Sequence, residues 1–148
     1  AHVHLARKDH QMALDRARQA VPLFRELGNR HWEGAMLDIV AQAQLAAGHI
    51  SEAQATAEEA MVLWRDLGDK AAVAMVKLET LTPANLARRN YSSALQTATE
   101  ASEAFRLLGD LKNRSIAQLT AGGVLQITRQ NPELVEQLID EAETIFVG

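Results

Sequence analysis

Small residues followed by one large residue recur at helical spacing in four segments of the chain. The four positions of each segment are separated by four, three and four residues, which places their side chains on one face of an α-helix. We therefore predict helices over residues 10–27, 51–67, 91–108 and 132–146. The positions are Ala13, Ala17, Ala20 and Phe24; Ala53, Ala57, Ala60 and Trp64; Ala94, Ala98, Ala101 and Phe105; and, with larger residues, Val135, Ile139, Ala142 and Phe146.

The tripeptide Leu-Gly-Asn or Leu-Gly-Asp marks the ends of the first three helices. It occurs at Leu27–Asn29, Leu67–Asp69 and Leu108–Asp110, so the pattern repeats at an almost constant interval. Glycine can adopt the left-handed conformation that ends a helix, and the Asn or Asp after it can cap the next helix. We predict a tight turn between antiparallel helices at each tripeptide.

N-terminal signals precede three of these helices. Asp9 precedes the first, and Ser51 with Gln54 forms a capping-box pattern at the second. Asn131 followed by Pro132 precedes the fourth. We expect these residues to begin the corresponding helices.

Three intervening segments, 30–47, 70–88 and 111–129, form a second family of predicted helices. They align with one another at the period of the tripeptide, and residues 1–6 align with 41–46, so we expect the chain to begin with the tail of another such helix. The aligned positions are Leu37, Leu78 and Leu119; Ala41, Thr82 and Gly123; and Leu45, Leu86 and Ile127.

Two prolines fall inside predicted helices. Pro22 and Pro83 have no amide proton to donate to the carbonyls of Arg18 and Glu79, so each is expected to kink its helix. Alternatively, both are tolerated irregularities in a drifting repeat.

The pattern predicts an all-α fold, an α-solenoid of antiparallel helix pairs that forms a single array over residues 1–148. The array would hold a partial repeat at 1–28 and repeats at about 29–68, 69–109 and 110–148. Units of this length bury their apolar faces by stacking on one another, and the long surface that results is the usual binding surface of such arrays.

Composition narrows the function classes. The chain has 47% hydrophobic and 23% charged residues, a net charge of −4 and no cysteine. It has no basic stripe for nucleic acid and no apolar run of the roughly 18 to 20 residues that cross a bilayer. A chain without cysteine suits a reducing compartment, so we predict an intracellular, cytoplasmic protein that binds neither nucleic acid nor membrane. Because it lacks an initiator Met and opens within a predicted helix, we expect it to be a piece of a longer protein.

The repeated pattern resembles the tetratricopeptide repeats, in the long variant of about 40 residues found in kinesin light chains and spindle-orientation scaffolds. Ala41, Ala53 and Ala60 match the small residues of that family. The resemblance covers the whole chain and implies a right-handed superhelix. In addition, the segments HLARKD (4–9) and FRELGNR (24–30) resemble repeat arrays of polyketide-synthase-like multidomain proteins.

The chain departs from the family at one aromatic position. Gln44, Asn85 and Gln126 replace the usual Tyr, and His4 aligns with them in the partial repeat. We hypothesise that these amides bond between successive helices of the second family or to backbone carbonyls, because a buried amide without partners costs roughly 1 to 3 kcal/mol. Alternatively, they are solvated.

The resemblance also implies a peptide-binding groove lined by the second family of helices. A pair of carboxylates near its start would disfavour an acidic ligand and suit a basic or amphipathic helical peptide, with an apolar anchor further along. Alternatively, Asp38 and Glu79 only solvate an exposed face. The groove residues that the resemblance implies are Asp38, Gln42 and Leu45; Glu79, Pro83 and Leu86; and Thr120, Val124 and Ile127.

Catalytic signals are lacking. The histidines have no pair at the spacing of four that zinc sites on helices use, and neither a nucleophile elbow nor a phosphate-binding loop is present. We predict a protein without catalytic residues, cofactor or metal, and not an enzyme. Two functions remain in competition. One is a scaffold that binds a protein or peptide in the groove, and the other is an assembly module that forms homo-oligomers through its ends or convex face.

Overall fold

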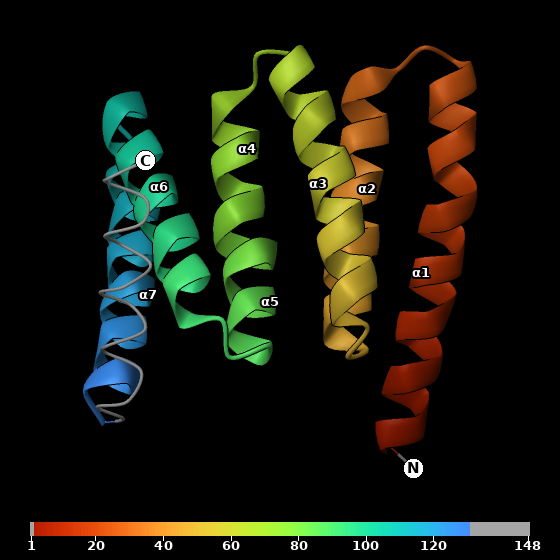
Figure 1. Cartoon of the computed structure of the whole chain (residues 1–148). Coiled ribbons are helices and arrows are strands. Elements are labelled where there is room, and N and C mark those ends of the chain that lie inside the picture. The colour runs from red at the N-terminus through yellow and green to blue at the C-terminus, as the bar shows by residue number, and fades with distance from the viewer. Residues whose placement is uncertain (1, 131–148) are drawn as a thin grey trace. The chain divides into compact units, whose positions relative to one another are not determined.

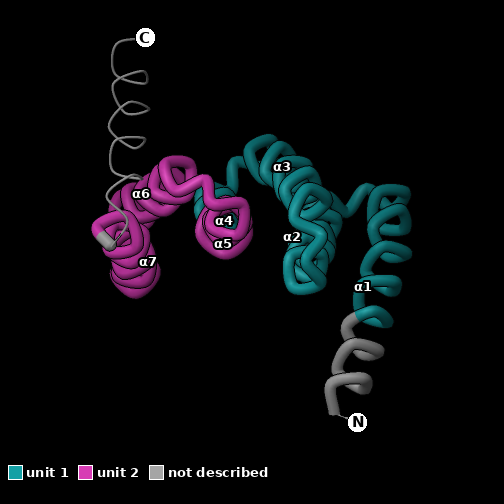
Figure 2. Tube along the Cα trace, turned by 60° about the horizontal axis from the view of Figure 1, so that its bottom comes forward, with its two compact units in different colours: residues 1–76 teal, residues 77–148 magenta. Residues whose placement is uncertain are grey.

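The computed structural model describes residues 2–130, with side chains from Gln11 to Arg129. This part of the chain is all-helical and consists of six helices that pack in antiparallel pairs in chain order, when the consecutive helical segments of residues 70–87 are counted as one (Figure 1). The residues divide into two compact units, 1–76 and 77–148 (Figure 2). The predicted helix over 132–146, with its start at Asn131 and Pro132, lies outside the described residues.

Unit 1 contains α1 (His2–Glu26), α2 (Arg30–Ala46), α3 (Ile50–Asp66) and α4 (Lys70–Val76). Each of these helices packs against the next one along the chain. Because the connecting turns are short, neighbouring helices run in opposite directions (Figure 1). The predicted helices 30–47 and 51–67 are confirmed to within a residue.

Unit 2 contains a π-helical segment, η1 (Lys77–Leu81), followed by α5 (Thr82–Ala87), α6 (Tyr91–Leu108) and α7 (Leu111–Gln130). Helix α6 packs against η1, α5 and α7. The segments α4, η1 and α5 follow one another without a turn and together occupy the predicted helix 70–88.

The predicted left-handed turns are confirmed at all three tripeptides. Gly28, Gly68 and Gly109 have φ of 71°, 73° and 75°. The backbone amide of the residue after each glycine bonds to the carbonyl of the aromatic residue that ends the stripe, which closes the helix in the Schellman arrangement. These bonds are Asn29 N to Phe24 O, Asp69 N to Trp64 O and Asp110 N to Phe105 O, each 2.9 Å.

Two further turns have the same geometry. Gly48 has φ of 84°, and at the equivalent place after α5 a non-glycine residue, Arg89, has φ of 59°. The amides of His49 and Asn90 complete these turns by bonding to the carbonyls of Gln44 and Asn85. The five turns, which are evenly spaced along the chain, therefore share one backbone conformation.

The predicted stripes of small residues form the core. Each alanine of the stripe in α3 and in α6 is 0% exposed, Trp64 is 4% exposed and Phe105 is 1% exposed. In α1, Ala17 of the stripe is buried, whereas Ala13 is exposed. Helix α1 packs mainly against α2, whereas α3 and α6 each have neighbours before and after them.

The predicted start of the first helix is wrong. Helix α1 runs from His2 to Glu26 without a break, so Asp9 is not an N-cap and residues 1–6 are not the tail of a separate helix. Position 8, which aligns with Gly48 and Arg89, is Lys8, and no glycine or proline occurs before Pro22. Nothing in this stretch therefore stops the helix.

The predicted caps have mixed outcomes. Asn29, Asp69 and Asp110 cap their helices, because their side-chain oxygens accept the amides of Trp32 (3.3 Å), Ala72 (3.0 Å) and Asn113 (3.1 Å). The capping box at Ser51 and Gln54 is wrong. Helix α3 begins at Ile50 after the N-cap His49, which makes no side-chain cap bond, and so Ser51 already lies in the first turn.

Pro83 lies next to an irregular helical segment, and the predicted kink stays a prediction. It stands at the start of α5, directly after the π-helical residues Lys77–Leu81. The Thr82 hydroxyl donates to the Lys77 carbonyl over 2.8 Å and so bridges the wide turn. Because proline cannot donate to the preceding turn, the ladder of i to i−4 bonds is interrupted here. Helix α1, by contrast, continues through Pro22 to Glu26.

Within the described residues, none of the helices combines the length and the apolar character that a bilayer crossing requires.

Candidate functional site

The nine predicted groove residues lie on four elements. Asp38, Gln42 and Leu45 belong to α2 in unit 1, and the others belong to η1, α5 and α7 in unit 2. Their exposure varies widely. Gln42, Glu79 and Ile127 are exposed; Asp38, Leu45, Pro83, Leu86 and Thr120 are half-buried; and Val124 is buried.

Asp38 is fixed by the core residue Trp64. The Trp64 indole N–H donates to the two Asp38 carboxylate oxygens at 3.2 and 3.4 Å. The same ring packs on Gly34 so closely that a Cβ at that position would lie 2.8 Å from it, and the His31 ring meets it edge-on at 5.3 Å. Trp64 is therefore buried against α2, and its N–H sets the position of a carboxylate.

The same helix exposes two apolar side chains and one polar side chain on a neighbouring face. Trp32, Ile39 and Gln42 follow at intervals of seven and three residues and so share one face of α2. Trp32 is 50% exposed and Ile39 is 44% exposed. Stacking on Phe24 of α1, with ring centroids 6.0 Å apart, holds the Trp32 ring in place. We call Trp32, Asp38, Ile39 and Gln42 the α2 surface.

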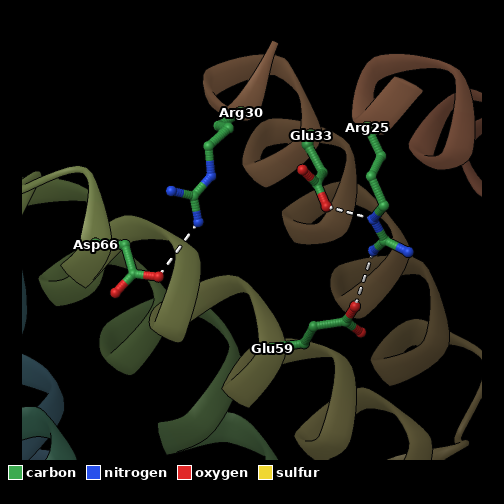
Figure 3. Close-up of polar contacts among 5 residues, drawn as sticks. All are labelled: Arg25, Arg30, Glu33, Glu59 and Asp66. Atoms are coloured by element: carbon green, nitrogen blue, oxygen red, sulfur yellow. Dashed lines mark hydrogen bonds and ion pairs between the residues drawn. The ribbon is translucent and has the colours of Figure 1, made fainter. Parts of the chain in front are cut away.

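Three arginines tie α3 to the helices before it. Glu52, Glu59 and Asp66 follow at intervals of seven residues, two helical turns, and so form one row along α3. Arg30 of α2 pairs with Asp66 at 3.2 Å (Figure 3). The other two pairs are Arg18 with Glu52 at 3.8 Å and Arg25 with Glu59 at 3.2 Å.

Arg25 also bonds a buried carboxylate. Its Nε donates to Glu33 Oε1 at 2.8 Å, and Figure 3 shows the guanidinium between Glu33 and Glu59. The bond to Glu33 is the main cause of a raised Arg25 pKa. Glu33 is only 8% exposed, so Arg25 satisfies a charge that burial would otherwise penalise. This network was not predicted, although the equal spacing of Arg18 and Arg25 and of the acids on α3 is visible in the sequence.

At Gln44 the predicted bond to a backbone carbonyl is confirmed, because its amide nitrogen donates to the Glu52 carbonyl at 3.1 Å. Its side-chain partners lie on α1 and α3 and not on the next helix of the second family. Gln44 is 6% exposed and meets Thr56 of α3 at 2.7 Å. The Thr56 hydroxyl donates its one proton to the Glu52 carbonyl, so the Gln44 amide nitrogen faces Thr56 and its oxygen accepts from Arg18 at 3.3 Å. This bond joins two successive helices of unit 1.

The predicted polar column does not continue unchanged. Asn85 is 8% exposed, but Gln126 is exposed. Thr97, which aligns with Thr56, bonds Thr82 at 2.7 Å. The side chain of His4 lies outside the described residues.

In unit 2 the predicted residues have different surroundings. Glu79 is exposed on η1, whereas its neighbour Lys77 pairs with Glu100 of α6 at 2.8 Å. Val124 lies in the core at 1% exposure instead of on an open surface. The reason is its position on α7: Ala117 and Thr128, seven residues before and four after, are also buried, and so all three share one face of the helix.

A metal-binding cluster of His, Asp or Glu residues does not occur among the side chains that the structure describes. Comparison of the chain with protein-family models, with curated proteins and with solved structures finds no match.

Proposed function

We propose that the chain is a non-catalytic scaffold that binds a basic or amphipathic helical peptide of another protein. The α2 surface carries this proposal: a carboxylate held in position by the core, on a helix that also exposes an aromatic and an aliphatic side chain. A helical ligand needs such a combination, with apolar contacts for its anchors and a polar group that sets its register. The tetratricopeptide resemblance adds support, since helix pairs of that family bind peptides on the equivalent helix.

The chemistry of Asp38 favours a cationic group in the ligand. A carboxylate has about four acceptor positions, so it can accept a donor from a ligand in addition to its bonds within the chain. A guanidinium or ammonium group supplies such a donor and also balances the charge. Glu79, on η1 of unit 2, has the equivalent sequence position, and we propose the same role for it.

Selection from a displayed library of random peptides, each long enough to form a helix of several turns, would identify ligands even though no partner is known. We expect the selected peptides to contain Lys or Arg near an apolar residue. Their affinity for the chain is then measured by fluorescence polarisation at low and at physiological salt.

Neutral variants test the acids. Asp38→Asn keeps an acceptor for Trp64 and removes the charge, and Glu79→Gln is its partner in a double variant. We expect weaker binding, mainly through slower association, and a smaller salt dependence. The control double variant, Glu26→Gln with Glu58→Gln, removes two exposed acids elsewhere and should bind as the unmodified chain does. Equal binding by both double variants would place the interface elsewhere.

Self-assembly is the competing proposal, and exposed leucines at the helix turns favour it. Leu27 is 76% exposed at the turn from α1 to α2, and Leu107 and Leu111 are 72% and 69% exposed at the turn from α6 to α7. Apolar side chains that gather on a surface promote association. Light scattering tests this proposal. Oligomers of the unmodified chain that dissociate in the double variant Leu107→Ser with Leu111→Ser would support assembly. A monomer at high concentration would contradict it.

A further inference from the structure

The spacing of the five left-handed turns has one exception. Three of the four intervals between the turn residues are 20 residues long, whereas the interval from Gly68 to Arg89 is 21. The helical run 70–87, which consists of α4, η1 and α5, lies in this interval and therefore has one residue more than the runs between the other turns. The turn residues are Gly28, Gly48, Gly68, Arg89 and Gly109.

The extra residue lies inside the helical run and not at its ends. Asp69 caps α4 as Asn29 caps α2, and these two residues are 40 positions apart. At the other end, the carbonyls of Gln44 and Asn85 accept the amides that complete their turns, and these two residues are 41 positions apart. The alignment therefore changes by one residue between Asp69 and Asn85. Because η1 is the stretch that departs from the α-helix there, the π turn takes up the extra residue.

Contacts with α6 and a proline keep the π turn at this place. The Thr82 hydroxyl donates to the Lys77 carbonyl over 2.8 Å and lies 2.7 Å from the Thr97 hydroxyl of α6. The Lys77 ammonium group pairs with Glu100 of α6 at 2.8 Å. Pro83 adds a steric reason, because the ring of a proline inside a regular α-helix clashes with the carbonyl four residues before it. The insertion is therefore held at η1 and does not shift along the helix.

The two halves of the helical run have different neighbours. Helix α4 packs against α3, whereas η1 and α5 pack against α6. The boundary between the two compact units falls at the start of η1, between Val76 and Lys77. A regular α-helix would be stiff at this point. A π turn interrupts the ladder of i to i−4 bonds instead, and helices kink at such turns.

We propose that η1 is a one-residue insertion that acts as a joint, where the helical run 70–87 bends and opens more readily than α2 does at the equivalent place. The run can then bend without loss of its packing on α3 or α6. Elements that move in proteins are drawn from segments that open locally at low cost. The inference concerns the backbone and is independent of the proposed peptide binding.

Deletion of a single residue tests the insertion. Removal of Glu79, the exposed residue of η1, restores an interval of 20 residues and should turn η1 into regular α-helix. The control is removal of the exposed Ile39, which lies 40 positions earlier in α2. No extra residue exists there, so the buried residues after Ile39 would turn by about 100° away from the core. Both deletions are made together with Pro83→Ala, so that proline does not interrupt the new α-helix.

Thermal unfolding, followed by circular dichroism, measures the effect of each deletion. We expect the Glu79 deletion to melt no lower than Pro83→Ala alone, and the Ile39 deletion to melt at least about 10 °C lower. A Glu79 deletion that lowers the melting temperature as much as the Ile39 deletion would overturn the insertion.

Amide hydrogen exchange tests the joint. In the unmodified chain, we expect the amides of residues 77–82 to exchange at least about tenfold faster than those of the equivalent residues 36–41 in α2. Exchange at η1 should become slow after the Glu79 deletion. Equal exchange in the two stretches would overturn the joint, and so would exchange at η1 that stays fast after the deletion.

Discussion

At the scale of single residues, Trp64 both packs in the core and holds a surface carboxylate by a hydrogen bond. Its ring fills the space above Gly34, and its N–H holds Asp38 on the α2 surface. A residue in the core thereby fixes the group that we propose meets the ligand. Removal of Trp64 should therefore affect both stability and binding.

Truncation of Trp64 to Ala should lower the free energy of unfolding by about 3 to 5 kcal/mol, the usual cost for a buried aromatic residue. Urea unfolding followed by circular dichroism measures it. The exposed Trp32→Ala serves as the matched control and should cost much less. A loss below about 1 kcal/mol for Trp64→Ala would mean that the ring is not a core residue.

Gly34 should show a direct coupling to Trp64. A methyl group at Gly34 would lie 2.8 to 3.0 Å from three ring atoms of Trp64, so Gly34→Ala should destabilise by about 1 to 3 kcal/mol. In a Trp64→Leu background that clash disappears, and the better helix propensity of alanine should make the same change neutral or stabilising. A double-mutant cycle of unfolding free energies measures the difference.

Gly122→Ala is the control for that cycle. A Cβ at Gly122, inside α7, meets no atom within 4 Å, so this change should stabilise the chain by up to about 1 kcal/mol. Equal effects of Gly34→Ala with and without Trp64 would contradict the packing.

At the scale of helices and turns, Arg89 departs from the rule that the other turns follow. Its φ of 59° costs roughly 1 kcal/mol in a residue with a Cβ, whereas the four other turns have glycine there. Arg89→Gly should therefore stabilise the chain by about 0.5 to 1 kcal/mol, as thermal unfolding would measure. The reverse change, Gly48→Arg, should destabilise it. A loss of stability on Arg89→Gly, or a gain on Gly48→Arg, would contradict this account.

The cap of α7 should make stability depend on pH. Bonds from the Asn113 backbone and side chain lower the Asp110 pKa, so this carboxylate stabilises the fold above its pKa in the unfolded chain. The contribution is lost as the pH falls through the folded pKa. Asp110→Asn keeps a capping oxygen and cannot titrate. The free energy of unfolding should be higher for the unmodified chain than for Asp110→Asn near neutral pH, and the two values should converge in acid. A difference that stays constant with pH would exclude the Asp110 charge as its cause.

Helices and turns were predictable because their signals are local. The Leu-Gly-Asx tripeptides fixed three turns, and the small-residue stripes identified the buried faces of α3 and α6. Prediction failed at Asp9 and Ser51, where a favourable cap residue was present but the helix started elsewhere. A residue with a good capping side chain becomes the N-cap only if the helix begins there, and a helix can also begin at a neighbouring position. No residue between the start of the chain and Asp9 breaks the helix.

The candidate site was less predictable than the fold. Asp38 and Gln42 were placed correctly on α2, but the bond from Trp64 to Asp38 depends on how two helices meet. Val124 was assigned to the groove from a resemblance, whereas its burial follows from the helical face that it shares with Ala117 and Thr128. Contacts across helices, such as Arg25 with Glu33 and Glu59, are set by packing and not by local spacing.

At the scale of the whole molecule, we propose a binding scaffold built from repeated helix pairs. Each unit has its own core, and the α2 surface of unit 1 and Glu79 of unit 2 carry the positions that we assign to ligand contact. The row of ion pairs along α3 lies on other positions of unit 1. These assignments leave the α2 surface as the main candidate for a partner.

Chemical-shift mapping tests the central claim most directly. A basic peptide selected from the library is titrated into the ¹⁵N-labelled chain, and the amide shifts are followed. We predict that the largest changes fall on α2, around Asp38, Ile39 and Gln42, and on η1 and α5 around Glu79. Changes confined to α1, α3 and α6, or to the ends of the chain, would contradict the proposed binding surface.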